Sequence, residues 1–123
     1  MLLLPSGHLE ACVAISAAPP AGVIALDVNF FKSNFPMINP FSSRDTPRLM
    51  PFNEFQFAFA NLLGEDDQRV AYDKYVVPES KNVPRDSRGD AGKIDFAAPH
   101  APLLLIAGTG DQIVPAVIGK KIF

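Results

Sequence analysis

The feature that most constrains the fold is a segment near the end of the printed sequence, Ala101-Pro-Leu-Leu-Leu-Ile-Ala-Gly-Thr-Gly-Asp-Gln-Ile-Val-Pro115. An apolar run over about 102–107 stops at a glycine-containing turn over 108–111, and this turn presents the carboxylate of Asp111. Pro115 then suits the first turn of a helix. This order predicts a buried strand that delivers an acid to the carboxyl edge of a parallel sheet, where open α/β folds hold their functional groups.

A second apolar run, over about 11–16, is bounded by Ser16 and Pro19-Pro20 and favours a strand by its length and its flanks. Because both runs are apolar throughout, we expect two strands that are buried on both faces and pair in parallel. About 86 residues separate Ser16 from Leu103, far more than a parallel crossover needs. The excess predicts an inserted subdomain over about 28–97, above the carboxyl edge of the sheet.

The expected insert is rich in aromatic residues. Eight of the ten phenylalanines lie between Phe30 and Phe59, among prolines whose density argues against long helices before position 51. Beyond that position apolar residues recur at helical spacing and predict an amphipathic helix over 52–63. Gly64 ends this helix, and the acids at 65–67 start a second one that reaches Pro78. The polar stretch 79–95 predicts an exposed loop.

The composition limits the classes of function. The length of 123 residues fits a single domain over 1–123, and the net charge of −2 gives no reason to expect nucleic acid or an anionic membrane as partner. Cys12 is the lone cysteine and reads as a small buried hydrophobe, so neither a disulfide within the chain nor a cysteine-built metal site is expected.

Neither a membrane anchor nor a cofactor is indicated by the sequence. The apolar start Met1-Leu-Leu-Leu-Pro5 is too short for the hydrophobic region of a signal peptide, and no run approaches a membrane span. We therefore expect a cytoplasmic protein. His8 and His100 lack the spacing to acids that is typical of metal ligands, so we expect neither a metal nor another cofactor.

The chain resembles the carboxyl-terminal half of serine hydrolases of the α/β-hydrolase superfamily. The resemblance lies in the order of three parts: Val13-Ala-Ile-Ser-Ala-Ala-Pro-Pro-Ala-Gly-Val23, the aromatic insert and the segment 102–115. In that family a Gly-x-x-Asp-x-x-Val-Pro pattern after a late strand carries the acid of the Ser-His-Asp triad. The residues Gly108, Asp111, Val114 and Pro115 match this pattern.

The resemblance implies the fold class and the partners. The fold would be α/β, a partial α/β-hydrolase fold with few parallel strands and an inserted helical cap. The segments 55–61 and 72–75 resemble that cap, where Phe55 and Phe59 would line an apolar substrate pocket. The intact relative would hydrolyse an apolar, ester-like small molecule, with Asp111 orienting the histidine of the triad.

The other two members of such a triad are missing from this sequence. No serine lies in a Gly-x-Ser-x-Gly elbow, and His8 and His100 both precede Asp111, whereas the family places its histidine after the acid. We therefore expect an incomplete and inactive fragment of an ester-type hydrolase.

Two alternatives stay open. In the first, Asp111 serves only to cap the following helix or to close the turn, as aspartates often do. In the second, the chain is a non-catalytic binding or interaction module that retains the apolar cap. Exposed strand edges would also allow oligomers or aggregation.

Overall fold

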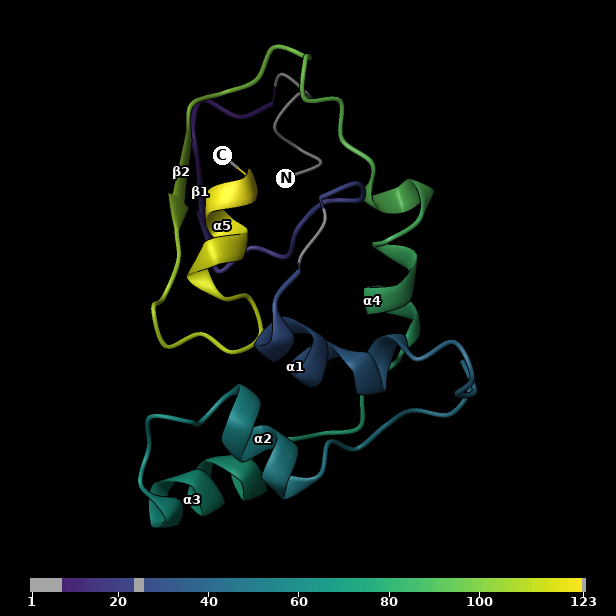
Figure 1. Cartoon of the computed structure of the whole chain (residues 1–123), viewed down its shortest axis with the longest axis vertical. Helices are drawn as coiled ribbons and strands as arrows, with labels where there is room; N and C mark the ends of the chain where they lie inside the picture. The colour runs from purple at the N-terminus through teal and green to yellow at the C-terminus, as the bar shows by residue number, and fades with distance from the viewer. Residues whose placement is uncertain (1–7, 24–25, 123) are drawn as a thin grey trace.

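The computed structural model describes residues 8–23 and 26–122, so the segment Met1–Pro5 lies outside the described residues. Two strands and five α-helices follow one another in this part of the chain (Figure 1): β1 (Cys12–Ile15), α1 (Val28–Ile38), α2 (Phe52–Ala58), α3 (Glu65–Tyr75), α4 (Asn82–Asp86), β2 (Leu103–Ile106) and α5 (Ala116–Ile122). A single 3-10 turn over Asp90–Gly92 follows α4. None of these helices is long and apolar enough to cross a membrane.

The expected fold class, an α/β fold of the partial α/β-hydrolase type with several parallel strands, is wrong. The described residues form a small, mostly helical domain whose one sheet contains two strands of four residues each. The physical reason lies in the distribution of apolar residues. Only two short runs are continuous enough for strands, and the long segment between them carries helical spacing and helix-capping residues instead.

The two strands themselves form where the apolar runs predict them. They pair in parallel, with Cys12 opposite Leu103 and Ile15 opposite Ile106, which confirms the expected pairing. Burial on both faces is wrong, because side chains alternate across a strand and helix α5 covers one face alone. The opposite face leaves four apolar side chains 45–69% exposed: Val13, Ile15, Leu104 and Ile106.

The main core lies between this sheet and α5. Ile118 is completely buried, Val114 and Ile122 are nearly so, and Leu105 and Phe30 pack against them. The turn at Gly108 and the helix that starts just after Pro115 are confirmed. The segment 102–122 therefore folds as a strand, a turn and a helix that packs back onto the strand.

Helix α1 overturns the expectation that prolines prevent long helices before position 51. It begins because the side chain of Asp27 accepts a hydrogen bond from the amide of Phe30 at 2.9 Å, which is an N-cap. Pro36 lies inside the helix but in its last turn, so its missing amide removes one bond close to the helix end. The capping aspartate thus decides the start of α1, and the proline does not prevent it.

Helices α2 and α3 begin where the sequence predicts, but α2 ends at Ala58 rather than at 63. The buried side chain of Gln68 on α3 donates to the carbonyls of Ala60 and Leu63, at 2.9 and 3.0 Å. These bonds fix a turn where the helix would otherwise continue.

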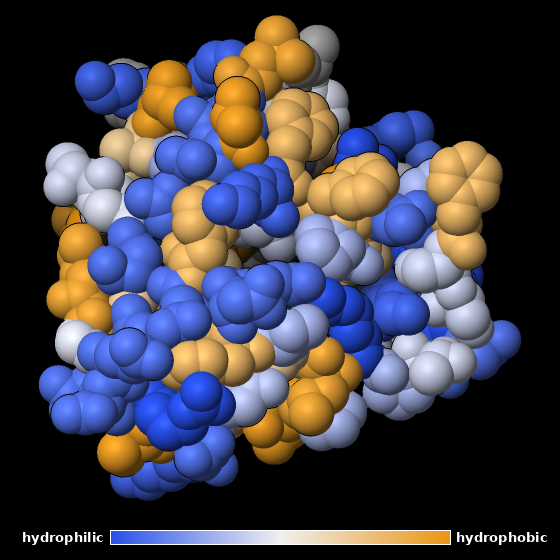
Figure 2. All heavy atoms as spheres, turned by 60° about the horizontal axis from the view of Figure 1, so that its bottom comes forward, coloured by the Kyte–Doolittle hydropathy of each residue, from blue (hydrophilic) through white to orange (hydrophobic). Residues whose placement is uncertain are grey.

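On the face shown in Figure 2, apolar residues form several separate patches among hydrophilic ones.

The expectation of a plain exposed loop over 79–95 is wrong in part, since it contains α4 and a 3-10 turn. Arg85 of α4 donates to the carbonyls of Met37, in the last turn of α1, and of Asn39 and Ser42, just after it. Lys81 is buried and donates to the carbonyl of Ser43 at 3.2 Å. These long-range bonds give a polar segment a fixed place against α1.

Candidate functional site

The carboxylate of Asp111 closes the turn in which it lies. Its Oδ1 atom accepts hydrogen bonds from the amides of Ile113 and Val114, at 2.9 and 2.8 Å. The amide of Asp111 in turn donates to the carbonyl of Gly108 at 3.3 Å. In this geometry the side chain of Asp111 closes the turn, as in the alternative role expected for it. The role of Asp111 as a triad acid stays a prediction.

The loop over 108–114 is also held from outside by the helical insert. Ser33 of α1 donates through its hydroxyl to the carbonyl of Gln112 at 2.8 Å. Asn61, in the turn between α2 and α3, donates to the carbonyl of Gly110 at 3.0 Å. Two separate parts of the insert therefore fix the loop that follows the carboxyl end of β2. In Figure 1, α1 lies beside the lower end of this loop.

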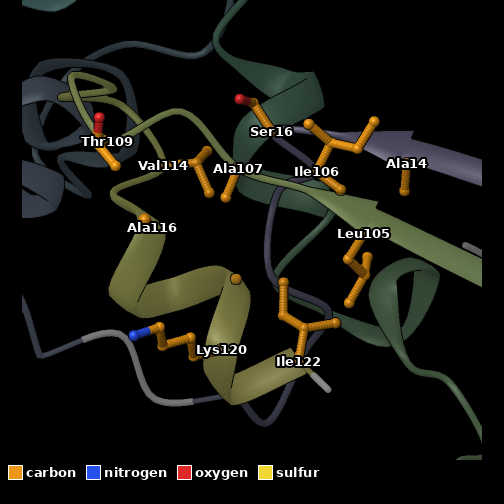
Figure 3. Close-up of a pocket in the computed structure, with 12 residues that line it drawn as sticks. Ala14, Ser16, Leu105, Ile106, Ala107, Thr109, Val114, Ala116, Lys120 and Ile122 are labelled. Carbon is orange, nitrogen blue, oxygen red and sulfur yellow. The ribbon is translucent and has the colours of Figure 1, made fainter.

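A pocket of about 450 Å³ lies between the two strands, this loop and α5 (Figure 3). Leu105 of β2 points toward Ile122 of α5, and these two side chains form part of its apolar wall. A Cβ atom on Gly119 would lie 3.2 Å from that of Ala107, so the glycine lets α5 come close to the end of β2. Twelve residues line the pocket: Ala14, Ser16, Ala17, Leu105, Ile106, Ala107, Thr109, Val114, Ala116, Gly119, Lys120 and Ile122.

The lining is mostly apolar, and its side chains include no carboxylate. Its polar side chains are the hydroxyls of Ser16 and Thr109 and the ammonium group of Lys120. In Figure 3 the amine of Lys120 points away from Leu105 and Ile122, toward the outside of α5. Such a surface suits a small molecule with an apolar body.

Of the two phenylalanines expected to line a substrate pocket, Phe55 packs α2 against α3 and Phe59 stacks on Phe55. Phe55 is buried and stacks on Phe59, with ring centroids 5.9 Å apart, and meets the ring of Tyr72 edge-on at 5.5 Å. Phe59 keeps 60% of its surface exposed. Neither ring belongs to the lining of the pocket next to α5.

Sequence reasoning identified Asp111 but missed the residues that line the pocket. Ser16 and Ile122 belong to segments more than 100 residues apart, and only the parallel pairing of β1 with β2 brings them to one place. In β1 the small side chain of Ala14 lies between the larger ones of Val13 and Ile15. Because side chains alternate along a strand, this pattern could have indicated that Ala14 faces α5 and leaves room there.

The histidines and acids of the described residues form no metal-binding group. His100 is exposed, and its Nδ1 lies 2.8 Å from the carbonyl oxygen of Ala101. Within 8–23 and 26–122 no set of three His, Cys, Asp or Glu side chains is arranged to hold a metal ion.

Comparison of the chain with protein-family models, with characterised proteins and with solved structures finds no significant match. The likeness to α/β-hydrolases therefore stays an expectation from the residues that carry it.

Proposed function

We propose that this chain is a non-catalytic binding module that takes up a small apolar molecule in the pocket between the sheet and α5. The observation that carries the proposal is the apolar pocket of about 450 Å³, which falls in the range of small-molecule sites. Pockets with mostly apolar walls and a few polar groups take up small molecules with an apolar body.

Hydrogen bonds hold the segments around the pocket in place, and this order supports a role of the pocket in ligand binding. Its wall includes Val114, which is buried in the core and whose amide is held by Asp111. The loop on the other side is fastened to α1 and to the α2–α3 turn. A wall that is already ordered before binding reduces the entropy lost when a ligand enters.

Toluene is a suitable probe, since it offers an apolar body with no polar group. In an NMR titration of the full chain we expect saturable shifts of the Leu105 and Ile122 methyl signals, while the methyls of Val70, outside the pocket, stay unchanged. The variant Ala14→Leu extends a side chain into the pocket and should weaken toluene binding at least about tenfold, since it occupies volume that the ligand needs.

Ala18→Leu is the matched control, because Ala18 is exposed and does not line the pocket. Equal toluene binding by the two variants, or pocket methyls that do not respond to toluene, would refute the proposal. A serine-directed fluorophosphonate separates binding from catalysis, and we expect it to label no serine of this chain.

A further inference from the structure

Ser16 has a backbone conformation that is unfavourable for a residue with a Cβ atom. It directly follows β1 and has a φ of +45°, the one positive φ among the non-glycine residues described. The amide of Ser16 donates to the carbonyl of Ile106 at 2.8 Å, which extends the sheet ladder and holds the residue in this conformation. Backbone strain of this kind is concentrated at binding sites and active sites.

The strained residue brings a hydroxyl to the pocket, and the lining holds a second hydroxyl at Thr109. Ser16 follows β1 and Thr109 follows β2, so both lie beyond the carboxyl ends of parallel strands that are paired in register. Both residues line the pocket. Within the described part of the chain, neither side-chain hydroxyl makes a hydrogen bond to another residue, so both are available to a ligand.

The side chains that line this end of the pocket are uncharged. Lys120, the one charged residue of the lining, lies at the other end of the view in Figure 3 from Ser16 and Thr109. Hydroxyls both donate and accept hydrogen bonds, so they suit a neutral oxygen group. The carboxylate of Asp111, which bonds the amide of the lining residue Val114, would repel an anionic ligand. A carboxylate would lose its hydration there without gaining a cationic partner.

From these observations we infer that the ligand is an uncharged molecule with an apolar body and one terminal hydroxyl, which bonds to the hydroxyl of Ser16 or to that of Thr109. The inference rests on the proposed function and adds the polar end of the ligand. The apolar body lies against Leu105 and Ile122.

Three matched probes test the inference on the full chain: toluene, benzyl alcohol and benzoate. Methyl shifts of Leu105 and Ile122 give each dissociation constant. We expect benzyl alcohol to bind about fivefold tighter than toluene, the effect of about one neutral hydrogen bond, and benzoate to bind more weakly than benzyl alcohol. Toluene binding without a preference for the alcohol would overturn the inference alone, as would tighter binding of benzoate.

Ser16→Gly is the informative variant, because glycine tolerates the positive φ and the fold is retained. If the bond is to Ser16, this variant should weaken benzyl alcohol about fivefold and leave toluene unchanged. If the bond is to Thr109, Thr109→Val should do so instead, whereas Ser80→Gly, in the exposed segment before α4, should bind all three probes like the wild type. An affinity for benzyl alcohol that is unchanged in both Ser16→Gly and Thr109→Val would overturn the inference. If none of the probes binds, the proposed function itself fails.

Discussion

Gln68 is the side chain whose replacement should reveal most about how the insert is held together. It is 9% exposed and makes three side-chain hydrogen bonds. Its Nε2 donates to the carbonyls of Ala60 and Leu63, and its Oε1 accepts from Gln56 at 2.7 Å. Gln68→Leu keeps the approximate volume of the side chain but removes all three bonds.

The expected cost follows from the individual bonds. Each is worth about 0.5–1.5 kcal/mol net. The carbonyl of Ala60 keeps the amide of Leu63 as a donor, at 3.0 Å, and the Leu63 carbonyl belongs to an exposed residue that water reaches. The apolar leucine recovers part of the loss. We therefore expect the free energy of unfolding to fall by about 2 kcal/mol, or Tm to fall by roughly 6–12 °C for a chain of this size.

Urea and thermal denaturation, followed by far-ultraviolet circular dichroism, measure this change. The matched control is Gln56→Leu, which removes one of the three bonds and should cost about 1 kcal/mol or less. A cost for Gln68→Leu below about 0.5 kcal/mol, or one equal to that of the control, would refute the reasoning that Gln68 fixes the α2–α3 turn.

Three further predictions concern the sheet and its loops. Ser16→Gly should raise the free energy of unfolding by about 0.5–1 kcal/mol in thermal denaturation, because relief of the positive φ outweighs the added freedom of the unfolded chain, and a lower Tm would contradict this. Asp111→Asn should change the free energy of unfolding in urea by less than about 0.5 kcal/mol, since an amide oxygen can accept the same two bonds. Asp111→Ala removes both bonds and should cost about 1–2 kcal/mol. Equal losses for the two variants would exclude the turn-closing role. Self-association through the exposed sheet should appear as a sedimentation coefficient that rises with concentration, and Leu104→Lys should abolish this rise while Val117→Lys, on α5, retains it; a chain that stays monomeric throughout would contradict the prediction.

The sequence predicted those parts of the fold that are set by neighbouring residues. The apolar runs identified both strands and their parallel pairing, and Pro115 and the acids at 65–67 located two helix starts. Each signal acts within a few residues. Strand formation, turn formation and capping are governed by that local chemistry, so one sequence was enough to find them.

The errors arose where distant contacts decide the structure. Helix α4 depends on the guanidinium of Arg85, which bonds carbonyls more than 40 residues earlier in the sequence. The exposure of one sheet face follows because α5 packs against the other face, where Leu105 meets the buried residues of α5. An apolar run such as 103–106 is the same in sequence whether one face or both become buried. Continuous hydrophobicity therefore predicted the strand but not the fold class.

The candidate site follows the same division. Asp111 was found because a glycine turn and an apolar strand mark it locally, but its neighbours were not. In the structure its carboxylate holds the amides of Ile113 and Val114, and Val114 is both a core residue and part of the pocket wall. The acid that the sequence marks for catalysis thereby sets the angle at which α5 returns to the sheet. Since the pocket is the space left between α5 and the strands, the turn at Asp111 determines its shape whether or not the carboxylate ever meets a substrate.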